Sequence, residues 1–580
     1  MKNLILIFNS IFIFEKKALK KKLTLIEYFF KNINLINYYF FLFNKNKHNP
    51  IKSHKFQKYI ELNKNKWAKE KINKLYSKNS ILVEAFINHP AYILSNIVTS
   101  MYLNAIFKMN IVGLIRTHDL KSEVLFRSFG VRNFIYFKNP NIYERIYYLI
   151  KALRLIKTKK NFEGVYKLKY KNIDVGLTAY DSYIRYLGIP TLNKINSNYI
   201  VFFAEALYSC DYISKKIDLF KFKKTIQSET QFSPLNILFQ LSLKNKIEVF
   251  SRLGLEKFTL RRYTSWKQRY SNRAMISQKT FNEVFKHCKK KSISIIKKNY
   301  QNKIKQKLFG VDEVVLGLSN KKTDLINKEK LLKTFKWKNK KIVVFFLSHL
   351  LDGNFNYGFR KNFKDIYSST EFIIDRLKKL TKVNWIIKKH PNQDYYSSKF
   401  DFQKKIKILE KECDHIRLVP ENIDSASLLK IADLALTISG SVGVEYPSFG
   451  VRSLFLEKSY YSNLNFLNYV KSKKQLIKYL QNAHKQKKIS NTLIEKCQVY
   501  LFLKDILIKN QSTLIPEYIP SRKIDENKFW LDAARHVKKF KFSEDEFYTM
   551  LKKQIKYSLR HTLNYNMLKI PKKKYNDFTD

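Results

Sequence analysis

The chain of 580 residues is too long for one ordinary domain, because domains usually hold about 100–200 residues. Its 45% hydrophobic and 15% aromatic residues suffice for large cores and exclude a disordered chain. The formal charge of +64 is compatible with an anionic partner. Only 18 of the 111 Lys and Arg residues are arginine, the side chain best suited to bidentate recognition of phosphates and bases, so we expect no nucleic-acid partner.

Two further features concern the location of the protein. The cysteines Cys210, Cys288, Cys413 and Cys497 form no C-x-x-C pair, which indicates neither a zinc site nor a disulfide framework and suits a reducing cytoplasm. An apolar run within residues 1–14 is too short to span a bilayer. It is explained either by a buried strand or helix or by an interfacial anchor, helped by the lysines at 16–22. We expect a cytoplasmic protein and leave open peripheral attachment to the inner, anionic face of the cell membrane.

The sequence pattern changes at residue 81. Residues 1–80 are basic and have the spacing of helices, whereas apolar strands alternate with helices from residue 81 on. The strands are expected at 81–86, 110–115 and 133–137, and the helices at 91–109, 121–129 and 142–157. This alternation predicts βαβ units and a parallel sheet. Further along, 170–185 and a strand with a hairpin over 246–260 stand out, and the lysine-rich stretch 321–341 is the candidate linker.

The second half has clearer boundaries. Strands are expected at 341–347, 383–388, 416–419, 434–438 and 453–456, and helices at 366–380, 402–412, 425–431, 442–448 and 473–481. They predict a doubly wound sheet of at least five strands. We therefore expect an α/β protein with a helical basic extension at 1–80, a Rossmann-like domain at 81–335, a second one at 336–500 and a helical extension at 501–580.

Ligands of such sheets bind at the carboxyl ends of the strands, so the residues there are the candidate site. One strand ends in Lys388, Lys389, His390 and Pro391, where imidazole and lysine could bind a phosphate oxygen. A strand-ending turn with a satisfied histidine explains these residues equally well. Ser348 and His349, with Asp352 shortly after, end another strand, although a flexible loop also explains them.

A third strand opens into a turn of small residues. Ser439, Gly440 and Ser441 precede a helix, whose N-terminus would offer free N–H groups and a favourable dipole to an anion. Glu445 lies one turn into that helix, where a carboxylate could bind ribose hydroxyls or simply be solvated. The spacing matches neither a dinucleotide fingerprint nor a Walker loop.

Two carboxylates in the first half are candidate bases. Glu84 lies within an apolar strand, where a carboxylate is costly unless it is paired or functional. Asp181 is four residues before Arg185, so an intrahelical ion pair is its simpler explanation. No acidic D-x-D motif indicates a metal, and no cofactor is expected.

Residues 343–466 resemble the bacterial capsular or surface polysaccharide biosynthesis family of GT-B glycosyltransferases. The resemblance is carried by Phe-Leu-Ser-His with Asp352, by Asn384-Trp-Ile-Ile-Lys-Lys-His-Pro, by Leu418-Val-Pro-Glu, by Ser427 to Asp433, by Thr437 to Gly450 and by Ser459 to Ser462. The Glu84 strand and residues 170–185 are similar to its N-terminal half more loosely. The acidic motif that houses the base in the polysialyl enzymes is not clearly present, and only Glu163-Gly164 comes near it.

The resemblance implies a GT-B fold, with two Rossmann-like domains facing across a cleft. It also implies transfer of a sugar from a nucleotide-sugar donor, with a CMP-sugar favoured, to a glycan or glycolipid acceptor of a surface or capsular polysaccharide. Since no D-x-D motif is found, we expect this transfer to need no metal. His390 and Pro391 then fall on the motif that binds the nucleotide phosphate. Ser439, Ser441 and Glu445 fall on the donor-binding turn and helix.

Three groups of residues have roles in this hypothesis. Glu84, favoured over Asp181, would take the acceptor proton, and His390, Lys388 and the 439–441 backbone would stabilise the leaving phosphate. The alternatives are a UDP-sugar 2-epimerase or polyol-phosphate transferase of the same architecture, and a non-catalytic basic protein that binds nucleic acid or a membrane surface.

Overall fold

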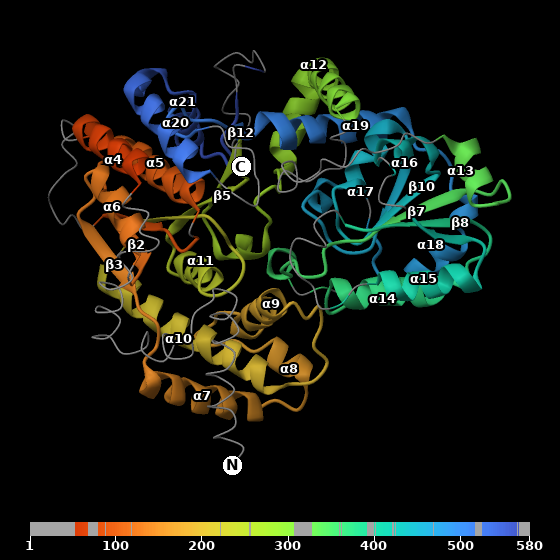
Figure 1. Ribbon diagram of the computed structural model, residues 1–580, viewed down its shortest axis with the longest axis horizontal. Helices are drawn as coiled ribbons and strands as arrows, with labels where there is room; N and C mark the ends of the chain where they lie inside the picture. Colours follow the sequence, from red (N-terminus) through yellow and green to blue (C-terminus); the bar gives the residue numbers. More distant parts are fainter. Residues whose placement is uncertain are drawn as a thin grey trace.

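Two sheets, each with helices on both faces, organise the chain (Figure 1). The computed structural model describes residues 53–67, 79–87, 89–117, 119–220, 222–254, 257–306, 327–358, 360, 362–390, 400, 402–419, 423, 425–467, 469–516, 525–564 and 567. The predicted apolar run at 1–14 and the lysines at 16–22 lie outside these residues, as do Pro391 and the first six residues of the predicted linker, 321–326.

The first sheet is mainly parallel. Its order is β12 (Lys509–Asn510), β6 (Phe258–Tyr263), β5 (Glu248–Leu253), β4 (Lys224–Gln227), β1 (Ser80–Glu84), β2 (Asn110–Arg116) and β3 (Asn133–Phe137). The strands from β5 to β3 run parallel, whereas β6 pairs antiparallel with both β5 and β12. The predicted strands of the first half are confirmed, including the hairpin. The central strand β4 was not predicted.

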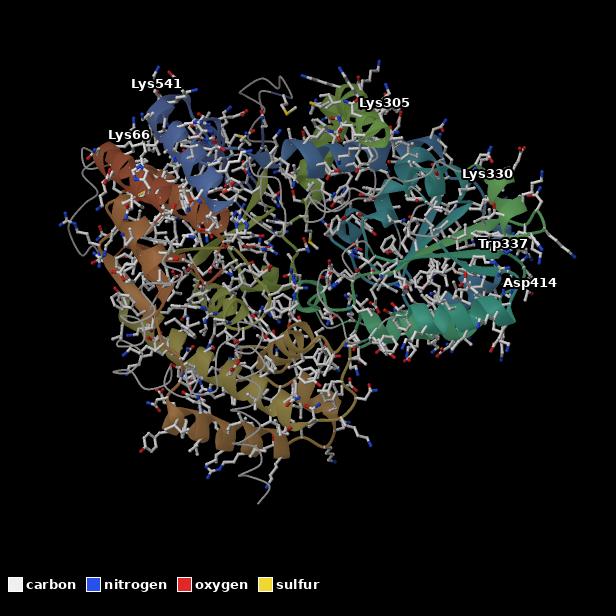
Figure 2. The ribbon with its side chains drawn as sticks, viewed as in Figure 1. Lys66, Lys305, Lys330, Trp337, Asp414 and Lys541 are labelled. Atoms are coloured by element: carbon white, nitrogen blue, oxygen red, sulfur yellow. The ribbon has the colours of Figure 1, made fainter. Side chains whose placement is uncertain are left out.

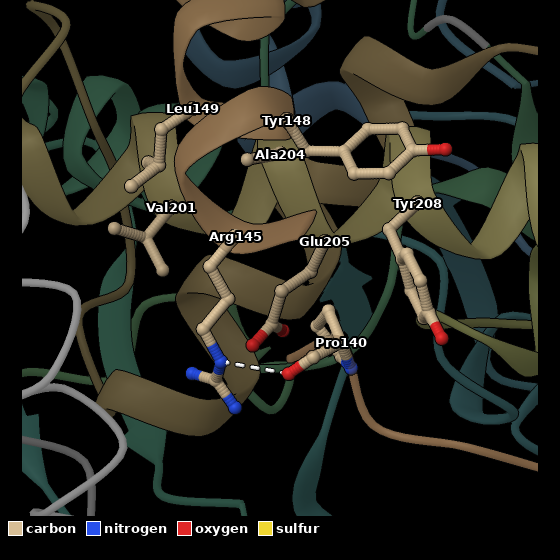
Figure 3. Close-up of a pocket in the computed structure, with 8 residues that line it drawn as sticks. All are labelled: Pro140, Arg145, Tyr148, Leu149, Val201, Ala204, Glu205 and Tyr208. Atoms are coloured by element: carbon tan, nitrogen blue, oxygen red, sulfur yellow. Dashed lines mark hydrogen bonds between the residues drawn. The ribbon is translucent and has the colours of Figure 1, made fainter. Parts of the chain in front are cut away.

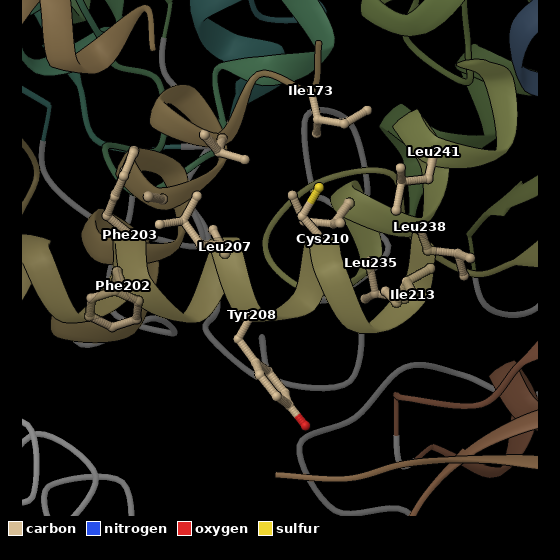
Figure 4. Close-up of a cluster of buried hydrophobic side chains, with 14 of the residues drawn as sticks. Ile173, Phe202, Phe203, Leu207, Tyr208, Cys210, Ile213, Leu235, Leu238 and Leu241 are labelled. Atoms are coloured by element: carbon tan, nitrogen blue, oxygen red, sulfur yellow. The ribbon is translucent and has the colours of Figure 1, made fainter. Parts of the chain in front are cut away.

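The helices of the first domain form two layers. One hydrophobic cluster lies between the sheet and α7 (Ile142–Lys157), α8 (Phe162–Tyr166), α9 (Val175–Leu187), α10 (Ser197–Phe220) and α11 (Leu235–Lys244). Figure 4 shows part of this cluster, with Leu207 and Cys210 on α10 and Leu238 on α11. The opposite face packs against α4 (His54–Trp67), α5 (Pro90–Phe107), α6 (Leu120–Ser128), α20 (Glu526–Lys539) and α21 (Glu546–Lys556).

The terminal helices α4 and α20 therefore belong to the same core. The rings of Phe56 and Trp530 lie 4.8 Å apart, centroid to centroid, although 474 positions separate them in the chain (530 − 56). Such edge-to-face aromatic pairs contribute about 1 kcal/mol beyond the area that they bury. The C-terminal extension thus packs on the first domain.

The second sheet is fully parallel. Its order is β11 (Arg452–Phe455), β10 (Leu434–Thr437), β7 (Ile342–Phe346), β8 (Asn384–Lys388) and β9 (Ile416–Leu418). One face packs on α14 (Ile366–Leu377), α15 (Gln403–Glu412) and α18 (Lys473–Gln481). The other packs on α12 (Gln278–Lys305), α16 (Ser425–Ile431), α17 (Val442–Glu445) and α19 (Asn491–Phe502), while α13 (Lys328–Thr334) precedes β7.

This topology confirms the predicted fold class, which is α/β with two doubly wound, Rossmann-like sheets of the GT-B kind, with the helix α4 before the first sheet and the helices α20 and α21 after the second. One helix differs from the expected division of the chain into domains at residue 335. Helix α12 shares its hydrophobic cluster with the second sheet, although it precedes residue 335.

The positive charge is spread over the surface. Figure 2 shows Lys66, Lys305, Lys330 and Lys541 on the outside of the molecule. These lysines belong to α4, α12, α13 and the segment between α20 and α21. Among the described residues, no helix is both long and apolar enough to cross a bilayer.

Candidate functional site

The strand order marks where each sheet can bind a ligand. In the second sheet the chain proceeds from β7 to β8 and β9 on one side and to β10 and β11 on the other. The gap beyond the carboxyl ends of β7 and β10 is therefore a topological switch point, the usual ligand position in such sheets. The first sheet has the same order around β1 and β4. Both switch points carry residues that the sequence singled out.

Two predicted histidines meet at the carboxyl edge of the second sheet, next to its switch point. His349 follows β7 and His390 follows β8, and their ring centroids lie 5.7 Å apart at an interplanar angle of 65°. His349 is buried, with 1% of its surface exposed, and its Nδ1 lies 3.4 Å from Oδ1 of Asp352. The parallel pairing of β7 with β8 creates this contact, because both strands end at the same edge.

Asp352 is the open member of this group. Its side chain is 59% exposed. Desolvation by the surrounding protein acts to raise the pKa of its carboxyl, but the neighbouring groups together, His349 foremost, hold the pKa below its ordinary value. Positive charge on Arg185 of α9 and on His390 acts in the same direction. The first domain thus contributes a cation to the group of side chains at the edge of the second sheet.

The loop after β7 also contains polar atoms without partners. Ser348 Oγ and Asn356 Nδ2 are buried and make no hydrogen bond within the described part of the chain. The other amide atom of Asn356, Oδ1, accepts a 3.0 Å hydrogen bond from Thr230 Oγ1 of the first domain. Because an unsatisfied buried polar group costs about 1–3 kcal/mol, such atoms mark places where a ligand can supply the missing partner.

The turn over 439–441 is tightly packed from behind. Tyr461 Oη donates a 2.8 Å hydrogen bond to the Gly440 carbonyl, and Ser459 Oγ donates one of 2.7 Å to the Ser439 carbonyl. A Cβ atom on Gly443 would lie 1.8 Å from Tyr461 Oη. Gly443 is therefore required by the approach of Tyr461, which gives the glycine of this motif a packing role.

The helix after this turn is shorter than predicted. We expected residues 442–448, but α17 ends at Glu445 and a 3-10 turn, Pro447–Phe449, follows. Proline has no N–H to continue the α-helical ladder, which explains the early end. A helix this short adds little dipole, so anion binding here depends on local N–H groups and side chains.

Glu445 lies next to a buried charged cluster. Burial raises the pKa of its carboxyl, and Asp505 raises the pKa further, against the opposing effect of Lys504. Lys504 and Asp505 belong to a π-helical turn, Leu503–Leu507, and their charged groups lie 2.6 Å apart. Tyr300 of α12 donates a 2.8 Å hydrogen bond to Asp505. Sequence reasoning missed this cluster, because neither π-helical turns nor contacts between α12 and the turn leave a local signal.

Glu84 occupies the switch point of the first sheet. It ends β1 and is fully buried, and its carboxylate accepts hydrogen bonds from the backbone N–H groups of Phe86 and of Ser228, the latter at 2.9 Å. Burial raises the pKa of this carboxyl. Since Ser228 directly follows β4, Glu84 fastens the loops after the two central strands to one another.

Asp181 connects the two domains. It is fully buried on α9, and its Oδ2 accepts hydrogen bonds from the N–H groups of Asn354, at 2.7 Å, and Phe355, at 2.8 Å. Its Oδ1 accepts a third from Asn354 Nδ2 at 3.0 Å. Burial raises the pKa of the carboxyl to about 6. From the sequence, an ion pair with Arg185 within the helix was the simpler explanation of Asp181, and this bridge between the domains was not predicted.

Two cavities of the described structure lie away from this edge. One, between α7 and α10, is lined by Arg145, Tyr148, Glu205 and Tyr208 and has about 20 Å³ of room, enough for about one water (Figure 3). Another, of about 180 Å³, is lined by Leu434, Arg452 and Tyr479. Leu434 and Arg452 begin their strands, so this cavity lies at the opposite edge of the sheet from the two histidines. In the described part of the chain no group of three or more His, Cys, Asp or Glu side chains could hold a metal ion.

Comparisons with known proteins give only remote likenesses. No family model and no curated protein matches the chain. Among solved structures, the KpsC β-Kdo 2,4-transferase of Thermosulfurimonas dismutans is 9% identical, with 48% of this chain and 79% of that chain covered and a TM-score of 0.29. A glycosyltransferase from Rickettsia africae is 10% identical, with 74% and 93% covered and a TM-score of 0.23. The wall teichoic acid polymerase TagF, in a structure with CDPG, is 12% identical, with 87% and 97% covered and a TM-score of 0.22. With TM-scores this low, the fold follows from the strand order and not from these likenesses.

Proposed function

We propose that the protein is a glycosyltransferase that moves a sugar from a nucleotide-sugar donor to a precursor of a bacterial surface or capsular polysaccharide. One observation carries the proposal. His349 and His390, from the neighbouring ends of β7 and β8, lie together at the carboxyl edge of a parallel sheet, next to its switch point. Imidazole N–H groups placed there can donate hydrogen bonds to the phosphate of a donor nucleotide.

The reaction would be a direct displacement. An acceptor hydroxyl oxygen bonds to the anomeric carbon while the bond from that carbon to the donor phosphate breaks, and the hydroxyl proton passes to a base. Negative charge grows on the leaving phosphate, so His390, His349 and Lys388 would lower the barrier by stabilising it. A single donor of this kind typically contributes about 3 kcal/mol. The buried Ser348 hydroxyl would bind the same phosphate.

The donor nucleoside would lie over the turn after β10. Ser439 and Ser441 flank Gly440 there, and Glu445 is partly exposed one turn further on. Its carboxylate suits a pair of ribose hydroxyls. We propose a CMP-sugar as donor, because His390 matches the phosphate-binding motif of the family that the sequence resembles.

Exposure separates the carboxylates that could act as the base. Glu84 and Asp181 are fully buried and their oxygens accept backbone hydrogen bonds, which must break before either could reach an acceptor. Asp352 is 59% exposed and lies beside His349. A base must come within hydrogen-bond reach of the acceptor hydroxyl, so the geometry favours Asp352.

Nucleotide binding tests the donor site. Thermal unfolding would be followed with CMP, CDP, UDP, GDP and ADP for the wild type, for His390→Ala and for His54→Ala, a control at an exposed histidine of α4. We expect CMP to raise the midpoint of the wild type and the control but not of His390→Ala, because only binding to the folded state stabilises it.

The other outcomes are informative. A shift with UDP alone would replace the CMP-sugar by a UDP-sugar and favour the epimerase alternative. Equal shifts for the wild type and His390→Ala would remove the phosphate site from the second domain. No shift with any nucleotide would contradict the proposed function.

A further inference from the structure

Helix α7 exposes large apolar side chains on its outer face. Tyr143 is 80% exposed, Tyr147 is 57% exposed and Ile150 is 44% exposed. With Ile142, α7 provides four of the eleven large hydrophobic side chains that the described surface exposes. Single exposed apolar residues are ordinary on protein surfaces, but a contiguous group marks an interaction site.

The helical repeat explains why these side chains form one stripe. Positions 143, 147 and 150 are spaced by four and three residues, so they lie on the same face, and the exposed Arg154 and Lys157 continue that face toward the C-terminus. The opposite face contains the buried residues Leu149, Ala152 and Ile156, which belong to the hydrophobic cluster of α10. We call Tyr143, Tyr147, Ile150, Arg154 and Lys157 the α7 stripe.

The position of α7 leaves this stripe accessible. In Figure 1, α7 is at the periphery of the first domain, and α10 lies between α7 and the first sheet. In Figure 3, Tyr148 and Leu149 of the same helix face Val201 and Ala204 of α10. A helix with apolar residues on both sides would normally be buried, so the α7 stripe requires an apolar partner.

The charges beside the stripe identify the chemistry of that partner. Helix α7 contains four cations, at 145, 151, 154 and 157, and one acidic residue, Glu144. The Glu144 carboxylate is occupied at the helix N-terminus, where it accepts a 2.8 Å hydrogen bond from Asn141 N. No described carboxylate lies within ion-pair distance of Arg154 or Lys157. A partner of the α7 stripe must therefore offer both apolar and anionic groups.

We infer that the α7 stripe docks the protein on an anionic lipid bilayer. Tyrosine suits the boundary between headgroups and acyl chains, because its ring is apolar and its hydroxyl is polar. Arginine and lysine in the same face pair with lipid phosphates, and each contributes about 1 kcal/mol near an anionic surface. A second copy of the chain fits less well, since two molecules of charge +64 repel one another. This inference is independent of the proposed transfer reaction.

Vesicle binding by the full chain tests the inference. Partition coefficients would be measured by co-sedimentation with phosphatidylcholine vesicles that contain about 30% phosphatidylglycerol, and with pure phosphatidylcholine. The variant Tyr143→Ser/Tyr147→Ser/Ile150→Ser keeps the net charge and removes the apolar groups. Its control, Ile408→Ser/Tyr479→Ser, removes exposed apolar groups from α15 and α18.

We expect the α7 variant to bind anionic vesicles about tenfold more weakly than the wild type, and the control to bind like the wild type. The charge reversal Arg154→Glu/Lys157→Glu should weaken binding more than Lys297→Glu/Lys298→Glu on α12, which changes the net charge equally. Equal effects of the two reversals would mean that total charge alone drives binding and would overturn the inference.

A second measurement does not depend on weakened vesicle binding by the variants. In Tyr147→Trp, the indole fluorescence should shift to the blue and be quenched by brominated acyl chains, whereas Tyr479→Trp, the matched change on α18, should show neither effect. Indole fluorescence that stays unquenched in Tyr147→Trp would contradict docking through this face. Concentration-dependent dimers that the triple serine variant abolishes would assign the stripe to a second copy instead.

Discussion

Asp181 of the first domain accepts a 2.7 Å hydrogen bond from the backbone N–H of Asn354 in the second, although 173 positions separate the two residues. The loop that Asn354 belongs to follows β7 and also contains His349, one of the two site histidines. The orientation of the first domain is therefore coupled to the loop that bounds the candidate donor site.

Replacing this carboxylate should loosen the connection between the domains. Asp181→Asn keeps the shape but leaves one acceptor oxygen for three donors, so we expect a loss of about 1–3 kcal/mol in unfolding free energy at pH 7. Urea unfolding measures it. Glu163→Gln, at an exposed residue of α8 that pairs with Lys167, should leave the unfolding free energy unchanged within the error of the measurement. A loss no larger in Asp181→Asn than in this control would contradict the bridging role.

The pH dependence of the same pair has a defined sign. Burial raises the pKa of Asp181 from 3.8 to about 6, so the folded state binds this proton more tightly than the unfolded state does. The stability from this group is present below about pH 4 and is lost as pH rises through about 6. The stability difference between wild type and Asp181→Asn should accordingly shrink from pH 4 to pH 7, as a series of urea titrations would measure. A difference that grows over this range would exclude the raised pKa.

Kinetics distinguish the candidate bases. With a nucleotide sugar chosen from the binding experiment, Asp352→Asn should lower kcat about 100-fold or more without moving the unfolding midpoint. Glu84→Gln should lower the midpoint by removing an acceptor for Phe86 and Ser228, while kcat per folded molecule stays within a few-fold of wild type. The opposite pattern would return the base to Glu84.

Gly443 provides a steric test of the turn. In Gly443→Ala the new methyl group would overlap Tyr461 Oη, so Tyr461 must move and its hydrogen bond to the Gly440 carbonyl is lost. We expect a destabilisation of about 2 kcal/mol and weaker nucleotide binding in the thermal-shift assay. Gly164→Ala, whose Cβ would meet Lys159 Cβ at 3.3 Å, is the control and should bind nucleotide normally.

The π-helical turn contributes a buried ion pair. Asp505→Asn leaves Lys504 without its closest carboxylate, and we expect a loss of about 3 kcal/mol at pH 7. Lys504 and Lys303 hold the pKa of Asp505 below its ordinary value despite desolvation, so its stabilisation exists above about pH 4 and disappears as pH falls. Chemical denaturation at pH 7 and at low pH should therefore show a difference from the wild type only at the higher pH. The control is Asp532→Asn, at a more exposed pair with Arg535.

The sequence predicted the second domain better than the first for a physical reason. Its strands are apolar runs bounded by turn residues, and helices 425–431 and 473–481 match the prediction residue for residue. Strand β4, Lys-Thr-Ile-Gln, has one strongly apolar residue and is held by its neighbours β1 and β5. No local pattern shows such a strand, so the partner of Glu84 at Ser228 could not be predicted.

The candidate site was predictable where it depends on strand ends. Parallel strands carry their ligand-binding residues at their carboxyl ends, which predicts His349 and His390 at one edge of the sheet, and the structure places the two rings in contact. The bonds of Asp181 to Asn354 and of Tyr300 to Asp505 join residues more than 170 positions apart, and only the tertiary structure determines them. The early end of α17 was predictable only in part. Pro447 was visible in the sequence, but the spacing of apolar residues alone did not fix the end of the helix.

The packing of α4 on α20 has a consequence for biosynthesis. Phe56 leaves the ribosome long before Trp530, the aromatic residue that covers it in the finished core. At about 5–20 residues per second, translation of the intervening 474 positions takes on the order of a minute. During that time Phe56, Tyr59 and Trp67 remain uncovered by their C-terminal partners, so the first domain of the nascent chain depends on chaperones or on transient contacts until α20 has been made.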